Sequence, residues 1–265
     1  MKVGLSAIIT PREWSFAQTV QEAKSAGYES LEVVLADEGD LTMDTPPAQL
    51  EKYAAIAADE GMELASVAAL VREAPKDLMT SDDAVRAASI DTMRRCLDAT
   101  AAMGVDTMLL TLGALSDDLY YHEAYANALQ ALQRLAPHAE AVQVNIAVEY
   151  VWNKFLLSPM EFARFCDEVG SRRVGLFFDT GNMTVFGYPQ HWVRICGAHL
   201  MKVHFKDFKR QGYQWMPLLE GDVNFPAVMA ELRTIGYDGP LLSEVAPSIA
   251  SLEDTADAIR RIIEM

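Results

Sequence analysis

The sequence predicts an α/β fold, a single (β/α)8 (TIM) barrel that spans residues 1–265. Eight short apolar runs alternate with segments long enough for a helix, and eight such units in ~250 residues is the number and size of this barrel. A glycine repeatedly ends a helix-like segment just before an apolar run, as expected at a helix C-terminus. No GxGxxG or Walker sequence follows the first run, which disfavours the alternative of an open doubly wound sheet.

The apolar runs are short and bounded by polar residues, which is typical of buried parallel strands. The eight predicted strands are Val3–Leu5, Leu31–Leu35, Leu64–Val67, Thr107–Leu110, Asn145–Val148, Val174–Phe178, Met201–Phe205 and Pro240–Ser243. The glycines that precede five of them are Gly27, Gly61, Gly104, Gly170 and Gly236. The order of elements is therefore strand, then helix, along the whole chain.

Helix signals fill the segments between these strands. Ser158-Pro159-Met160-Glu161 combines a capping box with proline at the first helical position. The longest segment without periodicity is 206–224, after the seventh strand. Because active sites of barrels lie at the carboxyl ends of the strands, we expect this segment to be functional.

Composition excludes several classes of protein. The chain has 22 Lys and Arg against 38 Asp and Glu, a net charge of −16, which disfavours binding to nucleic acids and to anionic membranes. No apolar segment is long enough to span a membrane, and the N-terminus lacks a signal-peptide pattern. Three widely spaced cysteines indicate a reducing compartment. We therefore expect a cytoplasmic protein, either a monomer or a homo-oligomer.

Four consecutive predicted strands end in, or carry, residues that bind divalent cations. The fifth ends at Glu149, the sixth at Asp179 and the eighth at Glu244, and the seventh carries His204. Adjacent strand ends in a barrel lie ~5 Å apart, so these side chains can converge on one point. Three carboxylates and one imidazole suit Mn²⁺, Mg²⁺ or Co²⁺ and, less well, Zn²⁺. The pattern predicts one divalent metal ion, with Glu149, Asp179, His204 and Glu244 as its ligands.

Glu149, the DTGN run from Asp179, the H-x-K-D run from His204 and the SEV run around Glu244 resemble the xylose isomerase-like TIM barrels. Among these sugar and sugar-phosphate isomerases and epimerases, the chain is most similar to the ketose 3-epimerases. The resemblance implies an isomerase with one metal, Mn²⁺ foremost, and a sugar or sugar phosphate as substrate. It also implies that the two glutamates are the catalytic acid and base.

Two departures from the family concern the substrate. Many members have histidine three residues after the aspartate ligand, where this chain has Asn182, and no arginine after the seventh strand is clearly matched. We expect Asn182 to contact substrate. Further substrate-binding candidates are Lys206, which shares the strand face of His204, together with Lys154 and Glu220. For each of these three, an ordinary surface or salt-bridge role is the alternative.

The expected reaction is inversion at carbon 3 of a ketose through a metal-stabilised cis-enediolate, with one glutamate on each face of the sugar. Two alternatives share the site or the fold. One is a metal-dependent lyase or dehydratase, similar to inosose dehydratase or eliminating a β-substituent from a keto sugar. The other is a non-catalytic sugar-binding barrel, because fold alone does not determine function.

Overall fold

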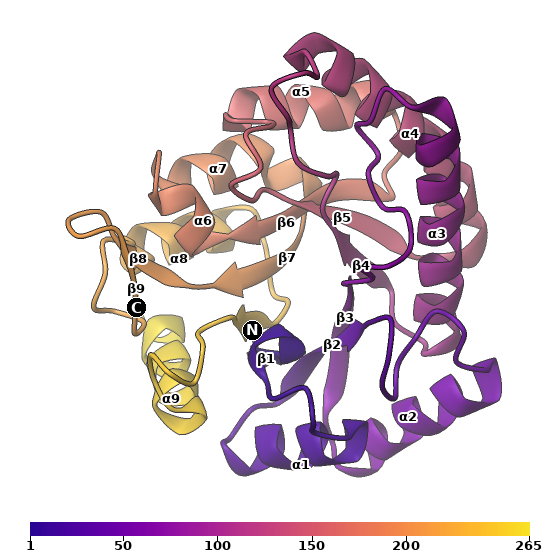
Figure 1. The fold of residues 1–265 in the computed structure, drawn as a ribbon. Coiled ribbons are helices and arrows are strands. Elements are labelled where there is room, and N and C mark those ends of the chain that lie inside the picture. The colour runs from indigo at the N-terminus through magenta and orange to yellow at the C-terminus, as the bar shows by residue number, and fades with distance from the viewer.

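Eight parallel strands close into a barrel in the computed structural model, which describes all 265 residues (Figure 1). The order around the barrel is β1-β10-β7-β6-β5-β4-β3-β2, and pairing of Val3 with Leu241 closes it. The strands are β1 (Val3–Ser6), β2 (Ser30–Leu35), β3 (Glu63–Ala69), β4 (Thr107–Leu110), β5 (Asn145–Glu149), β6 (Val174–Asp179), β7 (Leu200–Phe205) and β10 (Leu241–Ser243). The predicted (β/α)8 fold is confirmed, with every strand within two residues of its expected limits.

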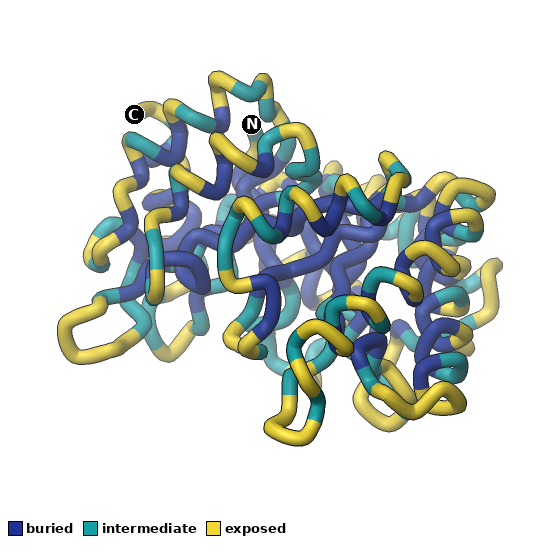
Figure 2. The backbone as a smooth tube through the Cα atoms, turned by 90° about the horizontal axis from the view of Figure 1, so that it is seen from above, coloured by how far each residue is buried: buried dark blue, intermediate teal, exposed yellow.

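Helices surround the barrel, so the strands form the buried centre and the outer helix faces are exposed (Figures 1 and 2). They are α1 (Phe16–Ser25), α2 (Pro47–Asp59), α3 (Asp83–Ala102), α4 (Tyr121–Val142), α5 (Pro159–Val169), α6 (Thr180–Thr184), α7 (Pro189–Cys196), α8 (Phe225–Thr234) and α9 (Leu252–Ile263), with 3₁₀ turns η1 (Ala7–Ile9) and η2 (Gly197–His199). None of these helices is both long and apolar enough to cross a membrane.

Local sequence sets the ends of the helices. The Ser158 hydroxyl accepts a hydrogen bond from the Glu161 amide at 3.2 Å and caps α5, as the capping-box pattern predicts. Gly170 ends the same helix with a φ of 76°, in the left-handed conformation. Between these ends, Phe162, Phe165, Cys166 and Val169 form one apolar stripe, and all four are buried. These two caps set where α5 begins and where the chain turns towards β6.

The segment 206–224, whose sequence shows no periodicity, contains a β-hairpin that the sequence analysis did not predict. An antiparallel hairpin, β8 (Asp207–Lys209) with β9 (Gln214–Met216), stands above the carboxyl end of β7. Asp207 is buried and accepts hydrogen bonds from the amides of Phe208, Gly221 and Val223 at 2.9–3.1 Å. This one carboxylate therefore ties both ends of the segment together and is not part of the candidate metal centre.

Gly175 in β6 leads to a prediction about stability. A Cβ atom at this position would lie 2.2 Å from the carbonyl oxygen of His199, which belongs to the backbone and cannot rotate away. We expect Gly175→Ala to lower the free energy of unfolding by about 1–3 kcal/mol, the usual cost of overpacking. The control is Gly187→Ala, where the nearest atom is at an ordinary 3.6 Å. Equal urea midpoints for the two variants would contradict the prediction.

Candidate metal centre

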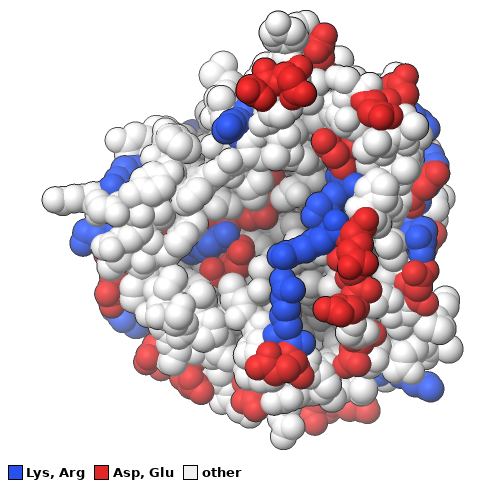
Figure 3. All heavy atoms as spheres, in the orientation of Figure 1, with Lys and Arg blue, Asp and Glu red and all other residues white.

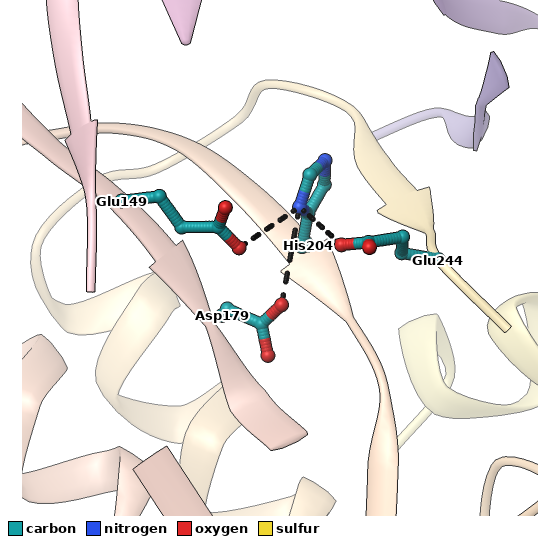
Figure 4. A group of neighbouring side chains, drawn as sticks. All are labelled: Glu149, Asp179, His204 and Glu244. Atoms are coloured by element: carbon teal, nitrogen blue, oxygen red, sulfur yellow. Dashed lines mark ion pairs between the residues drawn. The ribbon is translucent and has the colours of Figure 1, made fainter. Parts of the chain in front are cut away.

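The four predicted ligands meet at the carboxyl end of the barrel (Figure 4). Glu149 and Asp179 are the last residues of β5 and β6, and Glu244 follows β10 directly. In the strand register, Asp179 lies opposite His204, which fixes these two residues at the same level. The parallel strands thus bring side chains from four separate segments of the chain to one point.

One ligand atom from each residue falls within 4.8 Å of the others. The centre of the group is Nδ1 of His204, which lies 3.0 Å from Glu244 Oε2, 3.5 Å from Glu149 Oε1 and 3.9 Å from Asp179 Oδ2. In Figure 4 the two glutamates approach from opposite sides of the imidazole, and Asp179 approaches from a third direction. The donors therefore surround a common point.

The donor atoms fit a divalent cation. His204 Nδ1 is buried without a hydrogen-bond partner, although buried polar atoms are nearly always paired. Asp179 Oδ2 and Glu244 Oε2 are also buried, and the Lys206 ammonium, at 2.9 Å and 2.8 Å, is the cation that they share. Four carboxylates are buried or nearly buried here: those of Glu149, Asp179 and Glu244, and that of Glu32 on β2. The protein offers them at most two cations, Lys206 and His204. The cluster thus combines an excess of negative charge with oxygen and nitrogen atoms of the kind that bind Mn²⁺ and Mg²⁺.

Glu32 of β2 is a component that the sequence analysis missed. Its side chain is fully buried, and Oε1 lies 2.7 Å from Nε2 of His204. The hydroxyls of Ser6 and Ser66 each donate to this carboxylate at 2.7 Å. A carboxylate at Nε2 holds the proton on that nitrogen, which leaves Nδ1 free to act as a ligand. The available signal was a charged residue inside the otherwise apolar strand SLEVVL.

We expect Glu32→Leu to weaken Mn²⁺ binding by about 10–100-fold, because His204 would lose the partner that fixes its orientation and tautomer. Glu32→Gln should weaken it less, since the amide oxygen can still accept from Nε2. Calorimetric titration of the chelator-treated proteins with Mn²⁺ measures both affinities. The same Mn²⁺ affinity in Glu32→Leu as in the wild type would show that Glu32 has no positioning role.

Lys206 points into the cluster, as its position two residues after His204 predicted. Its Nζ lies 2.9 Å from Asp179 Oδ2 and 2.8 Å from Glu244 Oε2. The ammonium also lies 5.3 Å from the centre of the Trp215 ring, on the β8–β9 hairpin. The salt-bridge role considered from the sequence is therefore present, and the two partners of Lys206 are candidate ligands of the cluster.

The charges in the cluster shift one another's ionisation. Burial raises the pKa of Glu149 to about 7. Burial also acts to raise the pKa of Glu244, but Lys206 and His204 outweigh it and lower that pKa to about 2. Burial opposes the charge on Lys206, yet Asp179 and Glu244 raise the pKa of its ammonium. The two glutamates therefore differ in their tendency to hold a proton.

Asn182 lies beside Glu149 and is buried. Its Nδ2 group donates to Glu149 Oε1 and to the Tyr150 carbonyl, each at 3.2 Å, so the amide orients the glutamate. The backbone carbonyl of Asn182 accepts from the indole N–H of Trp152, whose ring stacks on Trp215 with ring centres 5.1 Å apart. These contacts fasten the hairpin next to the cluster. Contact between Asn182 and substrate stays a prediction.

The other two substrate candidates are not drawn into the cluster. Lys154 and Glu220 are both exposed, and neither side chain forms an ion pair or hydrogen bond. The cavity beside the cluster, of about 220 Å³, is lined instead by Lys206, Asp207 and Glu244 together with an apolar set: Ile9, Trp215, Met216, Val245, Ala246 and Ile249. Roles for Lys154 and Glu220 in substrate binding therefore stay predictions. Six of the residues that line the cavity are apolar.

Residues 20–264, almost the entire chain, match the model of one protein family, the xylose isomerase-like TIM barrel. The chain belongs to this family. The family resemblance proposed from the strand-end residues is thereby confirmed.

Curated relatives and solved structures agree with the assignment. The chain is 28% identical over 257 residues to an L-ribulose 3-epimerase of Methylomonas sp., covering 92% of this chain and 84% of that protein. It is 24% identical to the L-ribulose-5-phosphate 3-epimerase UlaE of Escherichia coli, covering 98% and 91%. A D-psicose 3-epimerase structure solved with D-fructose superposes with a TM-score of 0.80 at 19% identity, covering all of both chains, which shows the shared fold. The names of these relatives bear out the expected enzyme class, isomerase.

Proposed function

We propose that this family member is a metal-dependent ketose 3-epimerase, whose substrate is a ketose or ketose phosphate. The observation that carries the proposal is the placement of Glu149 and Glu244 on opposite sides of His204 Nδ1 (Figure 4). Inversion at a carbon atom needs one group that removes a proton from one face and another that returns a proton to the other. The named activities of the 3-epimerase relatives support the same reaction.

Glu149, Asp179, His204 and Glu244 would hold the cation, and Mn²⁺ is the ion that we expect. A divalent cation supplies stabilisation of the negative charge that develops on neighbouring oxygens of an enediolate. The Lys206 ammonium lies beside Asp179 and Glu244 and can donate a hydrogen bond to a substrate oxygen there. Asn182 holds Glu149 in place, and the stacked indoles of Trp152 and Trp215 lie beside Asn182 and Lys206.

The test is exchange at carbon 3. Incubation with a panel of ketoses and ketose phosphates in D₂O and Mn²⁺ should give deuterium at carbon 3 together with the 3-epimer, read by NMR. Release of water or of a β-substituent would instead indicate a lyase that uses the same proton abstraction. Absence of exchange for every member of the panel, in protein shown to contain the metal, would overturn the proposal.

A further inference from the structure

A cation of the protein itself, Lys206, lies among the carboxylates of the metal cluster, and its side chain is only 12% exposed. Basic and acidic side chains also lie together in the hollow of the face shown in Figure 3. The Lys206 Nζ lies 2.9 Å from Asp179 Oδ2 and 2.8 Å from Glu244 Oε2. The same two oxygens face His204 Nδ1, at 3.9 Å and 3.0 Å. The ammonium and a bound metal ion would therefore share two oxygen atoms.

The backbone of Lys206 is held by Thr180, the first residue of α6. The Thr180 hydroxyl accepts a hydrogen bond from the Lys206 amide at 3.0 Å and donates one to the Lys206 carbonyl at 2.6 Å. Beside them, a Cβ atom at Gly181 would lie 2.6 Å from Lys206 Cβ and 2.7 Å from the Trp215 ring. Helix α6, Lys206 and the β8–β9 hairpin are thus in close contact, and the ammonium enters the cluster from a fixed backbone position.

The charge of Lys206 acts in two opposite ways. Three of the four candidate ligands are carboxylates, which repel one another in a buried site, and Lys206 pairs with two of them. The ammonium therefore stabilises the close approach of Asp179 and Glu244. The same positive charge repels any divalent cation that these oxygens bind, because little water separates the two charges. Lys206 therefore favours the assembled cluster and opposes the metal ion.

The ammonium has a second stabilising contact, which does not involve the candidate ligands. Nζ lies 5.3 Å from the centre of the Trp215 ring, within the range of a cation–π interaction. Trp215 is held in turn by Trp152, whose ring is stacked on it at 5.1 Å with an angle of 5° between the planes. This contact continues to stabilise the ammonium when the two carboxylates bind a metal ion.

We propose that Lys206 is an internal counter-ion of the metal centre, which holds Asp179 and Glu244 together and weakens the binding of the divalent cation. A centre of this kind releases its ion more readily than the four ligands alone would. The inference rests on the metal centre of the proposed function and does not depend on which reaction that centre catalyses.

The test is the Mn²⁺ affinity of Lys206→Met, measured by calorimetric titration of chelator-treated protein. Methionine keeps the length of the side chain and removes the charge, so Mn²⁺ should bind about tenfold or more tightly than in the wild type. The metal-free variant should also have a lower Tm than the metal-free wild type, because two buried carboxylates lose their shared cation. A residue that only supported the structure would weaken Mn²⁺ binding when replaced.

Two further variants sharpen the test. Lys206→Gln loses the charge but can still donate hydrogen bonds to the carboxylates, so it should also bind Mn²⁺ more tightly, even if Lys206→Met folds poorly. Trp215→Leu removes the second contact of the ammonium and should weaken Mn²⁺ binding several-fold in the chain that contains Lys206. In the Lys206→Met background it should have no such effect, which a double-mutant cycle measures.

The matched control is Lys202→Met. Lys202 lies on the same strand, is 13% exposed and pairs with Asp106 at 3.4 Å, away from the cluster. This variant should leave the Mn²⁺ affinity unchanged. Unchanged or weaker binding in both Lys206→Met and Lys206→Gln, or an equal effect of Lys202→Met, would overturn the inference.

Failure of the proposed function gives a different result. A wild type that binds Mn²⁺ but exchanges no carbon-3 proton would overturn the epimerase reaction, and tighter binding in the Lys206 variants would still support the counter-ion. A wild type that binds no Mn²⁺ in the titration would overturn the metal centre, and the inference with it.

Discussion

Glu149→Gln and Glu244→Gln should each lower kcat for carbon-3 epimerisation by about 10²–10⁴-fold, the usual contribution of a positioned acid or base. Each glutamate faces the centre from its own side, with its oxygen 3.5 Å or 3.0 Å from His204 Nδ1. Because each serves one face of the substrate, loss of one stops inversion and leaves the other able to act on its own face. Each variant should therefore exchange the carbon-3 proton of only one of the two epimers with solvent.

Measurement of deuterium in each epimer separately, together with the bound metal, distinguishes loss of the proton-transfer group from loss of the ion. Glu51→Gln, an exposed carboxylate on α2, is the control and should behave as wild type. If both variants kept normal turnover with the metal in place, the acid and base would have to be other residues.

Asp179→Asn should weaken Mn²⁺ binding by about 100-fold or more. Asp179 is fully buried; Oδ1 already accepts from the Asn182 amide at 2.8 Å, so Oδ2 is the oxygen that faces the cluster. The substitution keeps the shape and the helix cap but places an NH₂ donor where a metal needs an electron pair. This loss exceeds that expected for Glu32→Leu, which acts through His204.

Thermal unfolding gives a second readout of the same variant. Mn²⁺ at 100 times its Kd should stabilise the wild type by about 2.7 kcal/mol, which raises Tm by roughly 5–10 °C for a chain of this size. Asp179→Asn should show almost no rise under the same conditions, whereas Asp59→Asn, an exposed residue of α2, should rise as the wild type does. Equal shifts for all three proteins would place the metal elsewhere.

The sequence was sufficient to predict the barrel and to bring together the four candidate ligands, because both depend on local patterns. Apolar runs and glycine stops mark the strands, and in a closed parallel barrel all strand ends meet at one edge. Glu149, Asp179 and Glu244 could therefore be brought together from their position at strand ends alone. Their placement required no knowledge of which loops touch.

Glu32 was missed because its partner is distant in sequence and lies across the barrel. It contacts His204, 172 residues away, from the middle of a strand whose end is apolar. The β8–β9 hairpin was missed for a different reason, since strands of three residues are too short to show alternation. The contact of the Lys206 ammonium with the Trp215 ring also depended on this hairpin.

The most direct test of the metal centre is a crystal grown with Mn²⁺, with diffraction data collected on both sides of the manganese absorption edge. The proposed centre predicts one strong anomalous peak within bonding distance of Glu149, Asp179, His204 Nδ1 and Glu244, with Glu32 still on Nε2. A peak bound to other residues, or none in crystals that hold Mn²⁺ at a saturating concentration, would contradict the assignment of these four residues as ligands.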